Sequence, residues 1–213
     1  MRRREFISLL PAGALAGEAG QAQRHTAEET LKDLMSGNER FVAGKSINPR
    51  QSPADFSKLA TGQSPDAVIV GCSDSRVSPE ILFDQGVGDL FVIRVAGNVI
   101  SGAGPTVKGS IAYAVVVLGA PLVMVLGHSQ CGAVKSALET KQLAVPDSIK
   151  DLVGMVTTGG EKDLDRAIVA NVRAGVAKLK SLEPTLTRYV ETKRLKVVGG
   201  VYDLATGKVS LVA

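Results

Sequence analysis

Hydrophobic residues fall into two kinds of pattern that alternate along most of the chain. Short apolar runs predict buried β-strands, at 67–70, 90–95, 121–126 and 195–202. Longer stretches with apolar residues at helical spacing predict α-helices, at 26–42, 106–118, 131–141 and 164–182. Strands that alternate with helices favour an α/β fold, in which a mainly parallel central β-sheet of four to five strands is flanked by helices, with an N-terminal helical arm.

Short signals set the limits of these elements. The sequence TAEE at 26–29 is a capping box, which begins the first helix. Gly119 is expected to end the second helix and Pro184 the last. The C-terminal sequence DLATGKVSLV predicts a hairpin with Thr206-Gly207 as its turn. The proline-containing polar segment before the first strand and the loosely patterned segment 142–163 are expected to be loops.

The first 25 residues differ from the rest, which we expect to form a single domain over 26–213. The N-terminus has three arginines, a short apolar stretch and the small-residue site Ala14-Leu15-Ala16. Arg3-Arg4-Glu5-Phe6-Ile7 resembles a twin-arginine export signal. We therefore expect a periplasmic or otherwise exported protein. The alternative is a basic amphipathic helix that stays attached to a cytoplasmic protein.

Composition excludes several classes of function. The chain has 213 residues, 45% of them hydrophobic and 22% charged, as expected for one globular domain. No apolar run reaches the roughly 18 residues of a membrane span, so none is expected. The net charge of +4 is modest, and no cluster of basic and aromatic residues follows residue 10, which argues against nucleic-acid binding. The glycine-containing segments 37–46 and 102–109 lack the spacing of a phosphate-binding loop.

Three residues with metal-binding side chains lie at predicted strand ends. Cys72 follows the first strand, His128 follows the third, and Cys131 comes three residues later. Parallel strands bring their carboxyl ends to one edge of a sheet, so these side chains should meet there. Two thiolates and one imidazole suit tetrahedral Zn²⁺, and three protein ligands leave the fourth position open, as in catalytic zinc sites.

Other interpretations of these residues remain open at this point. The two cysteines could form a disulfide or be inert buried thiols, and His128 could be an ordinary core histidine. Asp74 and Arg76 beside Cys72 favour the metal site. The N-terminus of the following helix should lower the pKa of Cys131 and favour its thiolate.

The sequences CSDSR at 72–76 and HSQCGA at 128–133 together resemble the paired signature of β-class carbonic anhydrases. The resemblance extends from about Thr26 to the C-terminus. It implies zinc ligands at Cys72, His128 and Cys131, and a catalytic carboxylate–guanidinium dyad of Asp74 and Arg76. It also implies a CO₂/bicarbonate pocket between two subunits, with substrate-binding residues Gln63, Phe91, Tyr113 and Gly132.

The activity implied by this resemblance is the zinc-dependent, reversible hydration of CO₂ to bicarbonate and a proton, by attack of zinc-bound hydroxide. Asp74 held by Arg76 would accept a hydrogen bond from the hydroxide, whereas a released Asp74 is a possible fourth zinc ligand in a closed state. The expected assembly is a homodimer or a higher oligomer built from dimers. Two alternatives are a CS₂/COS hydrolase on the same site and a non-catalytic zinc- or bicarbonate-binding protein.

Overall fold

The computed structural model describes residues 25–100, 104–139, 145–182 and 184–213. The expected export signal at 1–25 therefore lies outside the described residues, except for His25.

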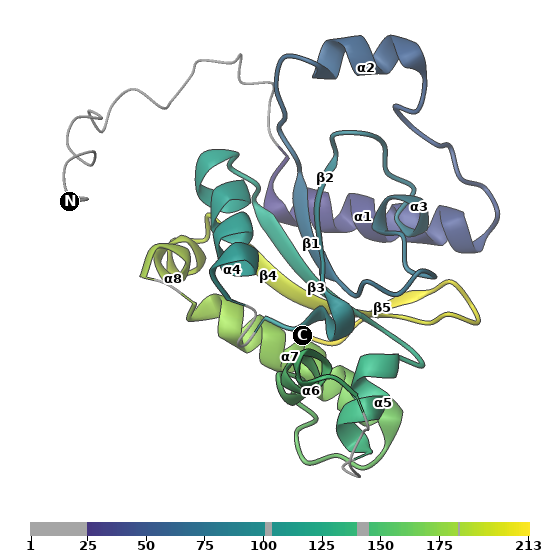
Figure 1. The fold of residues 1–213 in the computed structure, drawn as a ribbon. Helices are drawn as coiled ribbons and strands as arrows, with labels where there is room; N and C mark the ends of the chain where they lie inside the picture. Colours follow the sequence, from purple (N-terminus) through teal and green to yellow (C-terminus); the bar gives the residue numbers. More distant parts are fainter. Residues whose placement is uncertain (1–24, 101–103, 140–144, 183) are drawn as a thin grey trace.

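The described strands form one five-stranded sheet in the order β2-β1-β3-β4-β5 (Figure 1). Their bounds are β1 Ala67–Gly71, β2 Leu90–Arg94, β3 Leu122–His128, β4 Lys196–Tyr202 and β5 Val209–Leu211. All neighbouring pairs are parallel except β4 and β5, which are antiparallel. The α/β prediction with a mainly parallel sheet is thus confirmed.

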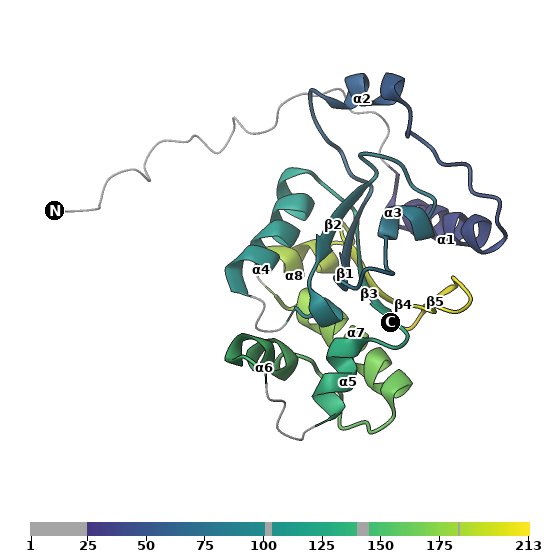
Figure 2. The same ribbon diagram turned by 45° about the vertical axis from the view of Figure 1, so that its right-hand side comes forward.

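Helices cover both faces of this sheet (Figure 1, Figure 2). The α-helices are α1 Ala27–Val42, α2 Pro53–Leu59, α3 Pro79–Leu82, α4 Gly104–Ala112, α5 Gly132–Leu138, α6 Asp147–Gly154, α7 Leu164–Lys180 and α8 Pro184–Glu191. Side chains of α1 and α3 pack with one face of the strands, while α4, α7 and α8 pack with the other. Successive strand residues point to opposite faces, and both faces are covered, so β1 is buried along its whole length.

The structure corrects several predicted element limits. The helix α6 lies inside the expected loop 142–163, and α2 lies inside the polar segment before β1. Pro184 does not only follow a helix but begins α8, because the first turn of a helix does not need the N–H that proline lacks. The helix α4 passes at Tyr113–Val117 into a π-helical segment, η2.

The C-terminal hairpin is present, but its turn is longer than predicted. The loop runs from Asp203 to Lys208, with a hydrogen bond of 2.9 Å from the Asp203 N–H to the Lys208 carbonyl. The Asp203 carboxylate accepts hydrogen bonds from the N–H groups of Ala205 and Thr206. An aspartate that bonds to the backbone just after it favours such a local turn.

The order of the strands determines where a site can form. The chain passes from β1 to β2 on one side, and then to β3 on the other side of β1. The strand order reverses between β1 and β3, and α/β proteins commonly bind ligands beyond the carboxyl ends of the strands at such a point. Among the described helices, none has the length and hydropathy needed to cross a membrane.

Candidate metal centre

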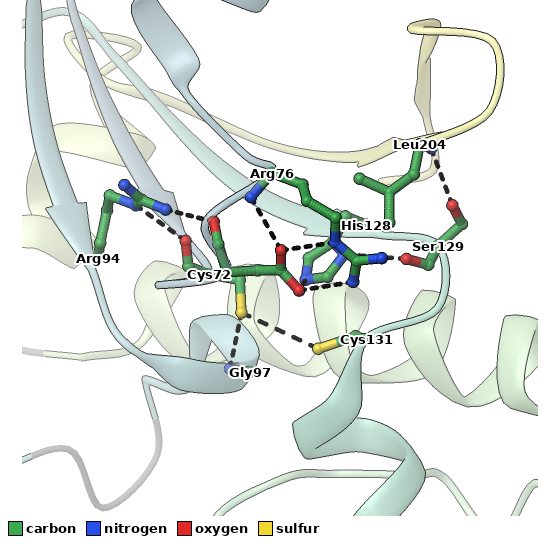
Figure 3. A network of polar contacts seen from close by, with 9 residues as sticks. Cys72, Arg76, Arg94, Gly97, His128, Ser129, Cys131 and Leu204 are labelled. Carbon is green, nitrogen blue, oxygen red and sulfur yellow. Dashed lines mark hydrogen bonds and ion pairs between the residues drawn. The ribbon is translucent and has the colours of Figure 1, made fainter.

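The structure brings the three predicted metal ligands together beyond the carboxyl ends of β1 and β3 (Figure 3). Cys72 directly follows β1, His128 ends β3, and Cys131 is the N-cap residue of α5. One ligand atom from each residue lies within 4.8 Å of the other two. All three residues are buried, with exposed fractions of at most 4%.

The two sulfur atoms are not bonded to each other. The Sγ atoms of Cys72 and Cys131 are 4.0 Å apart, about twice the length of a disulfide bond, and both thiols are free. This excludes the disulfide interpretation for the described structure.

The ring of His128 has one nitrogen available for a metal. Its Nδ1 lies 2.9 Å from the Ser129 carbonyl oxygen, which can only accept, so Nδ1 carries the proton. Its Nε2 is buried and has no hydrogen-bond partner among the described residues. A buried polar atom without a partner is costly, and a metal ion would satisfy it. The donor set and this free nitrogen therefore fit a zinc-type cation.

The two cysteines differ in acidity because they share one proton. The hydrogen bond from Cys131 is the largest of the effects that lower the pKa of Cys72 to about 4, against the opposing effect of burial, and the Gly97 N–H acts in the same direction as Cys131. The same bond to Cys72, together with burial, raises the pKa of Cys131. The expectation that the helix would lower the pKa of Cys131 is therefore wrong for the net shift, although the amides of α5 do act in that direction. A bound cation would displace the shared proton.

Asp74 is held by Arg76 beside these ligands. The Arg76 guanidinium donates from Nε to Oδ1 at 2.9 Å and from Nη2 to Oδ2 at 2.8 Å, and its backbone N–H donates to Oδ1 at 3.0 Å. These bonds, with the Arg76 side chain contributing most, hold the pKa of Asp74 well below its usual range despite partial burial. Asp74 Oδ2 lies only 3.8 Å from His128 Nε2, so the carboxylate is both paired and close to the candidate metal ligands.

Arg94, which the sequence did not single out, fixes the backbone of this loop. It ends β2 and donates from Nε to the Cys72 carbonyl at 3.0 Å and from Nη2 to the Asp74 carbonyl at 2.5 Å. A cation at the end of an apolar strand is the one sequence signal that could have indicated it.

The predicted substrate-binding residues do not gather at this site within one chain. Gln63 is exposed and precedes the amino end of β1, whereas Cys72 follows the carboxyl end of the same strand. Phe91 pairs with Val68 near the amino end of β1, and its ring centroid lies 6.5 Å from that of Tyr113. Tyr113 is 47% exposed.

Gly132, by contrast, directly follows Cys131 and begins α5. It is exposed, and a Cβ atom at this position would have no neighbour within 4 Å among the described residues. Its predicted role in substrate binding stays a prediction.

Comparisons with known proteins agree with this site. A sequence model of a family described as carbonic anhydrase matches residues 67–209. A carbonic anhydrase from Mycolicibacterium smegmatis is 42% identical over 189 residues, which covers 84% of this chain and 90% of that protein. Carbonic anhydrase 2 from Mycobacterium tuberculosis is 43% identical with the same coverage.

Solved structures lead to the same fold family. A tetrameric β-carbonic anhydrase from Sordaria macrospora matches with a TM-score of 0.69 at 28% identity, covering 86% of this chain and 97% of that chain. A Coccomyxa β-carbonic anhydrase in complex with acetazolamide matches with a TM-score of 0.67 at 27% identity, covering 85% of this chain and 86% of that chain. The chain therefore belongs to the β-carbonic anhydrase family of enzymes.

Proposed function

We propose that the chain binds Zn²⁺ through Cys72, His128 and Cys131 and catalyses the reversible hydration of CO₂ to bicarbonate and a proton. The observation that carries this proposal is the buried ligand set with a free His128 Nε2, next to an ionised Asp74. Two sulfurs and one imidazole nitrogen are a donor set that zinc prefers, and family membership makes CO₂ the first substrate to test.

Zinc held there would supply a Lewis acid that makes water nucleophilic near neutral pH. Two thiolates donate more charge to the metal than two imidazoles would, so we expect activity to be higher at alkaline pH. The protein's own part is to position the water. The Asp74 carboxylate is ionised and its orientation is fixed by Arg76, so it can accept a hydrogen bond from the attacking water. The geometry also supports a second state, in which Asp74 leaves Arg76 and becomes a metal ligand itself.

We infer that the substrate pocket is completed by a second copy of the chain. Gln63, Phe91 and Tyr113 lie towards the amino ends of the strands, away from Cys72 of the same chain. The strand β2 lies at an edge of the sheet, and the neighbouring η2 exposes Tyr113, Val116 and Val117. An edge strand next to exposed apolar side chains is a surface that a partner commonly covers. A homodimer, or a larger assembly of dimers, would place one copy's pocket residues near the other's metal centre.

The proton released in the reaction has no free histidine to carry it. The chain has two histidines, and His128 is a proposed ligand. His25 lies 3.4 Å from Asp33 on a different part of the molecule, near the amino end of α1. We therefore propose proton release to water or buffer, with Asp74, or Tyr113 of a second copy, as a candidate to pass the proton on. We also keep export through residues 1–25 as a proposal, which N-terminal sequencing of the mature protein would test.

A stopped-flow assay with a pH indicator tests the proposed function directly. Protein stripped of metal and then titrated with Zn²⁺ is expected to gain CO₂ hydration activity until one zinc is bound per chain. Cys131→Ser should lower both the zinc bound and the activity. Full zinc occupancy without CO₂ hydration would contradict the proposal.

A further inference from the structure

The Cys72 sulfur receives a hydrogen bond from the protein backbone. The Gly97 N–H donates to Cys72 Sγ at 3.2 Å, and this contact is buried (Figure 3). Gly97 lies in a three-residue 3₁₀ turn, Ala96–Asn98, that follows β2. An N–H that points at a thiolate ligand draws negative charge from the sulfur and so changes how strongly it donates to a metal.

Gly97 cannot be replaced without moving this turn. Its φ angle is +72°, in the left-handed region that favours glycine. A Cβ atom there would lie 3.1 Å from the Ala133 Cβ and 3.3 Å from the Val156 Cγ2. Ala133 belongs to α5, which Cys131 caps, so the turn is packed against the segment that carries the third ligand.

The turn has little hydrogen bonding of its own to keep it in place. Within it, the Asn98 N–H donates to the Val95 carbonyl at 2.8 Å. A turn this short gains little stability by itself, so its position depends on contacts from other elements.

Asn171 on α7 supplies such a contact from the opposite side. It is only 5% exposed, and its Nδ2 donates to the Gly97 carbonyl at 2.8 Å in a buried hydrogen bond. Its Oδ1 accepts from the Thr157 N–H at 3.0 Å. The side-chain amide therefore bridges two loops, and Gly97 is held on both sides: through its carbonyl by Asn171 and through its N–H by Cys72.

We propose that Asn171 is a positioning residue for the metal centre: it holds Gly97 so that the Gly97 N–H stays bonded to the Cys72 sulfur and limits the charge that this sulfur donates. This inference rests on the proposed function, because it concerns the strength of a metal ligand. Asn171 touches none of the reacting atoms and acts only through Gly97 and Cys72.

Cobalt-substituted full-length protein tests the proposal, because thiolate-to-cobalt charge-transfer absorption reports how readily sulfur donates. Asn171→Ala removes the amide, and Asn171→Leu removes it while keeping most of the side-chain volume. In both variants the Cys72 sulfur should donate more strongly, so the band is expected to move to longer wavelength. The zinc forms should lose about tenfold in kcat/KM.

Val176→Ala is the matched control. Val176 is buried on the same helix and packs towards β4, away from Gly97. It should lower the melting temperature without moving the cobalt band. A band that is unchanged in the Asn171 variants, or that moves equally in the control, would overturn the proposal.

A second measurement needs no variant. In wild-type protein loaded with an NMR-active cadmium isotope, the Gly97 amide proton should show scalar coupling to the metal across the N–H···S bond. If cadmium is bound by both cysteines and this coupling is absent, the positioning role is contradicted. If cobalt-substituted wild-type protein shows no thiolate-to-cobalt charge-transfer band, the proposed metal site itself is contradicted instead.

Discussion

Asp74 lies between two alternative partners. It is bonded twice by the Arg76 guanidinium, yet its Oδ2 is 3.8 Å from the His128 nitrogen that is free to bind metal. Its side chain is 18% exposed and that of Arg76 is 54% exposed, so solvent or a ligand can reach the arginine more easily than the carboxylate. The orientation of the Asp74 carboxylate therefore depends on a partner that is itself accessible.

Asp74→Asn keeps the shape of the side chain but removes its charge and one acceptor. We expect kcat/KM for CO₂ hydration to fall about 100-fold or more, with zinc content unchanged, because the amide orients the attacking water poorly. Asp165→Asn, which changes an exposed carboxylate on α7, is the control and should keep wild-type activity. Equal activity of the two variants in the stopped-flow assay would show that Asp74 has no catalytic role.

Among single residues, the sequence indicates those whose side chains could bind the metal or the reacting molecules directly. Cys72 and Asp74 stand out because a thiol and a carboxylate directly follow a buried apolar strand. Arg94 and Asn171 do not stand out, because each acts on a distant backbone group. The Asn171 partner, Gly97, is 74 residues away, and no local pattern in α7 encodes that contact.

Among the elements, α1, α3 and the loop between α1 and α2 are joined by one buried carboxylate. Asp84 accepts a hydrogen bond of 2.6 Å from Arg40 and bonds from the N–H groups of Ile47 and Asn48. Burial would raise the pKa of Asp84, but these bonds outweigh it and lower the pKa below its ordinary value. The ionised form is therefore the one that stabilises the fold.

Asp84→Asn should lower the free energy of unfolding by about 3 kcal/mol at pH 7, as expected when one partner of a buried pair is lost. Because the folded pKa is lowered, wild type has the full contribution above about pH 4 and loses it as the pH falls through the folded value. Urea denaturation at several pH values should thus show the two proteins converging in acid. The exposed Asp151→Asn is the control, and a pH-independent difference would contradict this account.

Close approach of α7 to the sheet depends on glycines in the strands. A Cβ atom on Gly127 of β3 would lie 2.6 Å from the Val172 Cγ2. We expect Gly127→Ala to cost about 2 kcal/mol of stability, because the added methyl overpacks this contact. Adding Val172→Ala should recover about 1 kcal/mol relative to the sum of the single variants. Gly71→Ala is the control, because its Cβ would have no neighbour within 4 Å in the part of the chain that the structure describes. Full additivity in thermal denaturation would count against the packing argument.

The succession of strands and long helices could be predicted from the sequence, but several helices could not. The strand runs are recognisable because a sheet covered on both faces needs continuous apolar segments. The helix α6 is hard to predict because it has only eight residues, fewer than helical periodicity needs to be recognised, although its apolar residues Ile149, Leu152 and Val153 share one side of the helix. Pro184 follows one helical pattern and so predicts its end, but proline also begins helices, as it does in α8.

For the whole molecule, the residues that we propose for one pocket lie at opposite ends of the strands of a single chain. The metal ligands lie beyond the carboxyl ends, and Gln63, Phe91 and Tyr113 lie towards the amino ends. In the proposed assembly, a second copy of the chain brings these two groups of residues together. The sequence of one chain has no direct signal for this, because the contacts that define an oligomer are made between chains.

Val117→Glu tests the assembly. Val117 is 57% exposed in η2, so a glutamate there stays in water in a monomer. In a dimer interface the same carboxylate would be buried without a partner, which destabilises the interface. Analytical ultracentrifugation is expected to show an oligomer for the wild-type protein and monomers for Val117→Glu. The variant should also lose most of its activity. Ile149→Glu on α6, another exposed apolar position, should leave the oligomer intact. A wild-type protein that is itself an active monomer would contradict the shared pocket.

Zinc-edge X-ray absorption of the purified protein tests the central claim most directly, because it counts the ligands of the metal. We predict one zinc per chain with two sulfur neighbours at about 2.3 Å and two nitrogen or oxygen neighbours at about 2.0–2.1 Å. In Cys131→Ser, one sulfur neighbour should be lost. A zinc shell without sulfur, or the same two sulfurs in Cys131→Ser, would contradict the assignment of Cys72, His128 and Cys131 as the metal ligands.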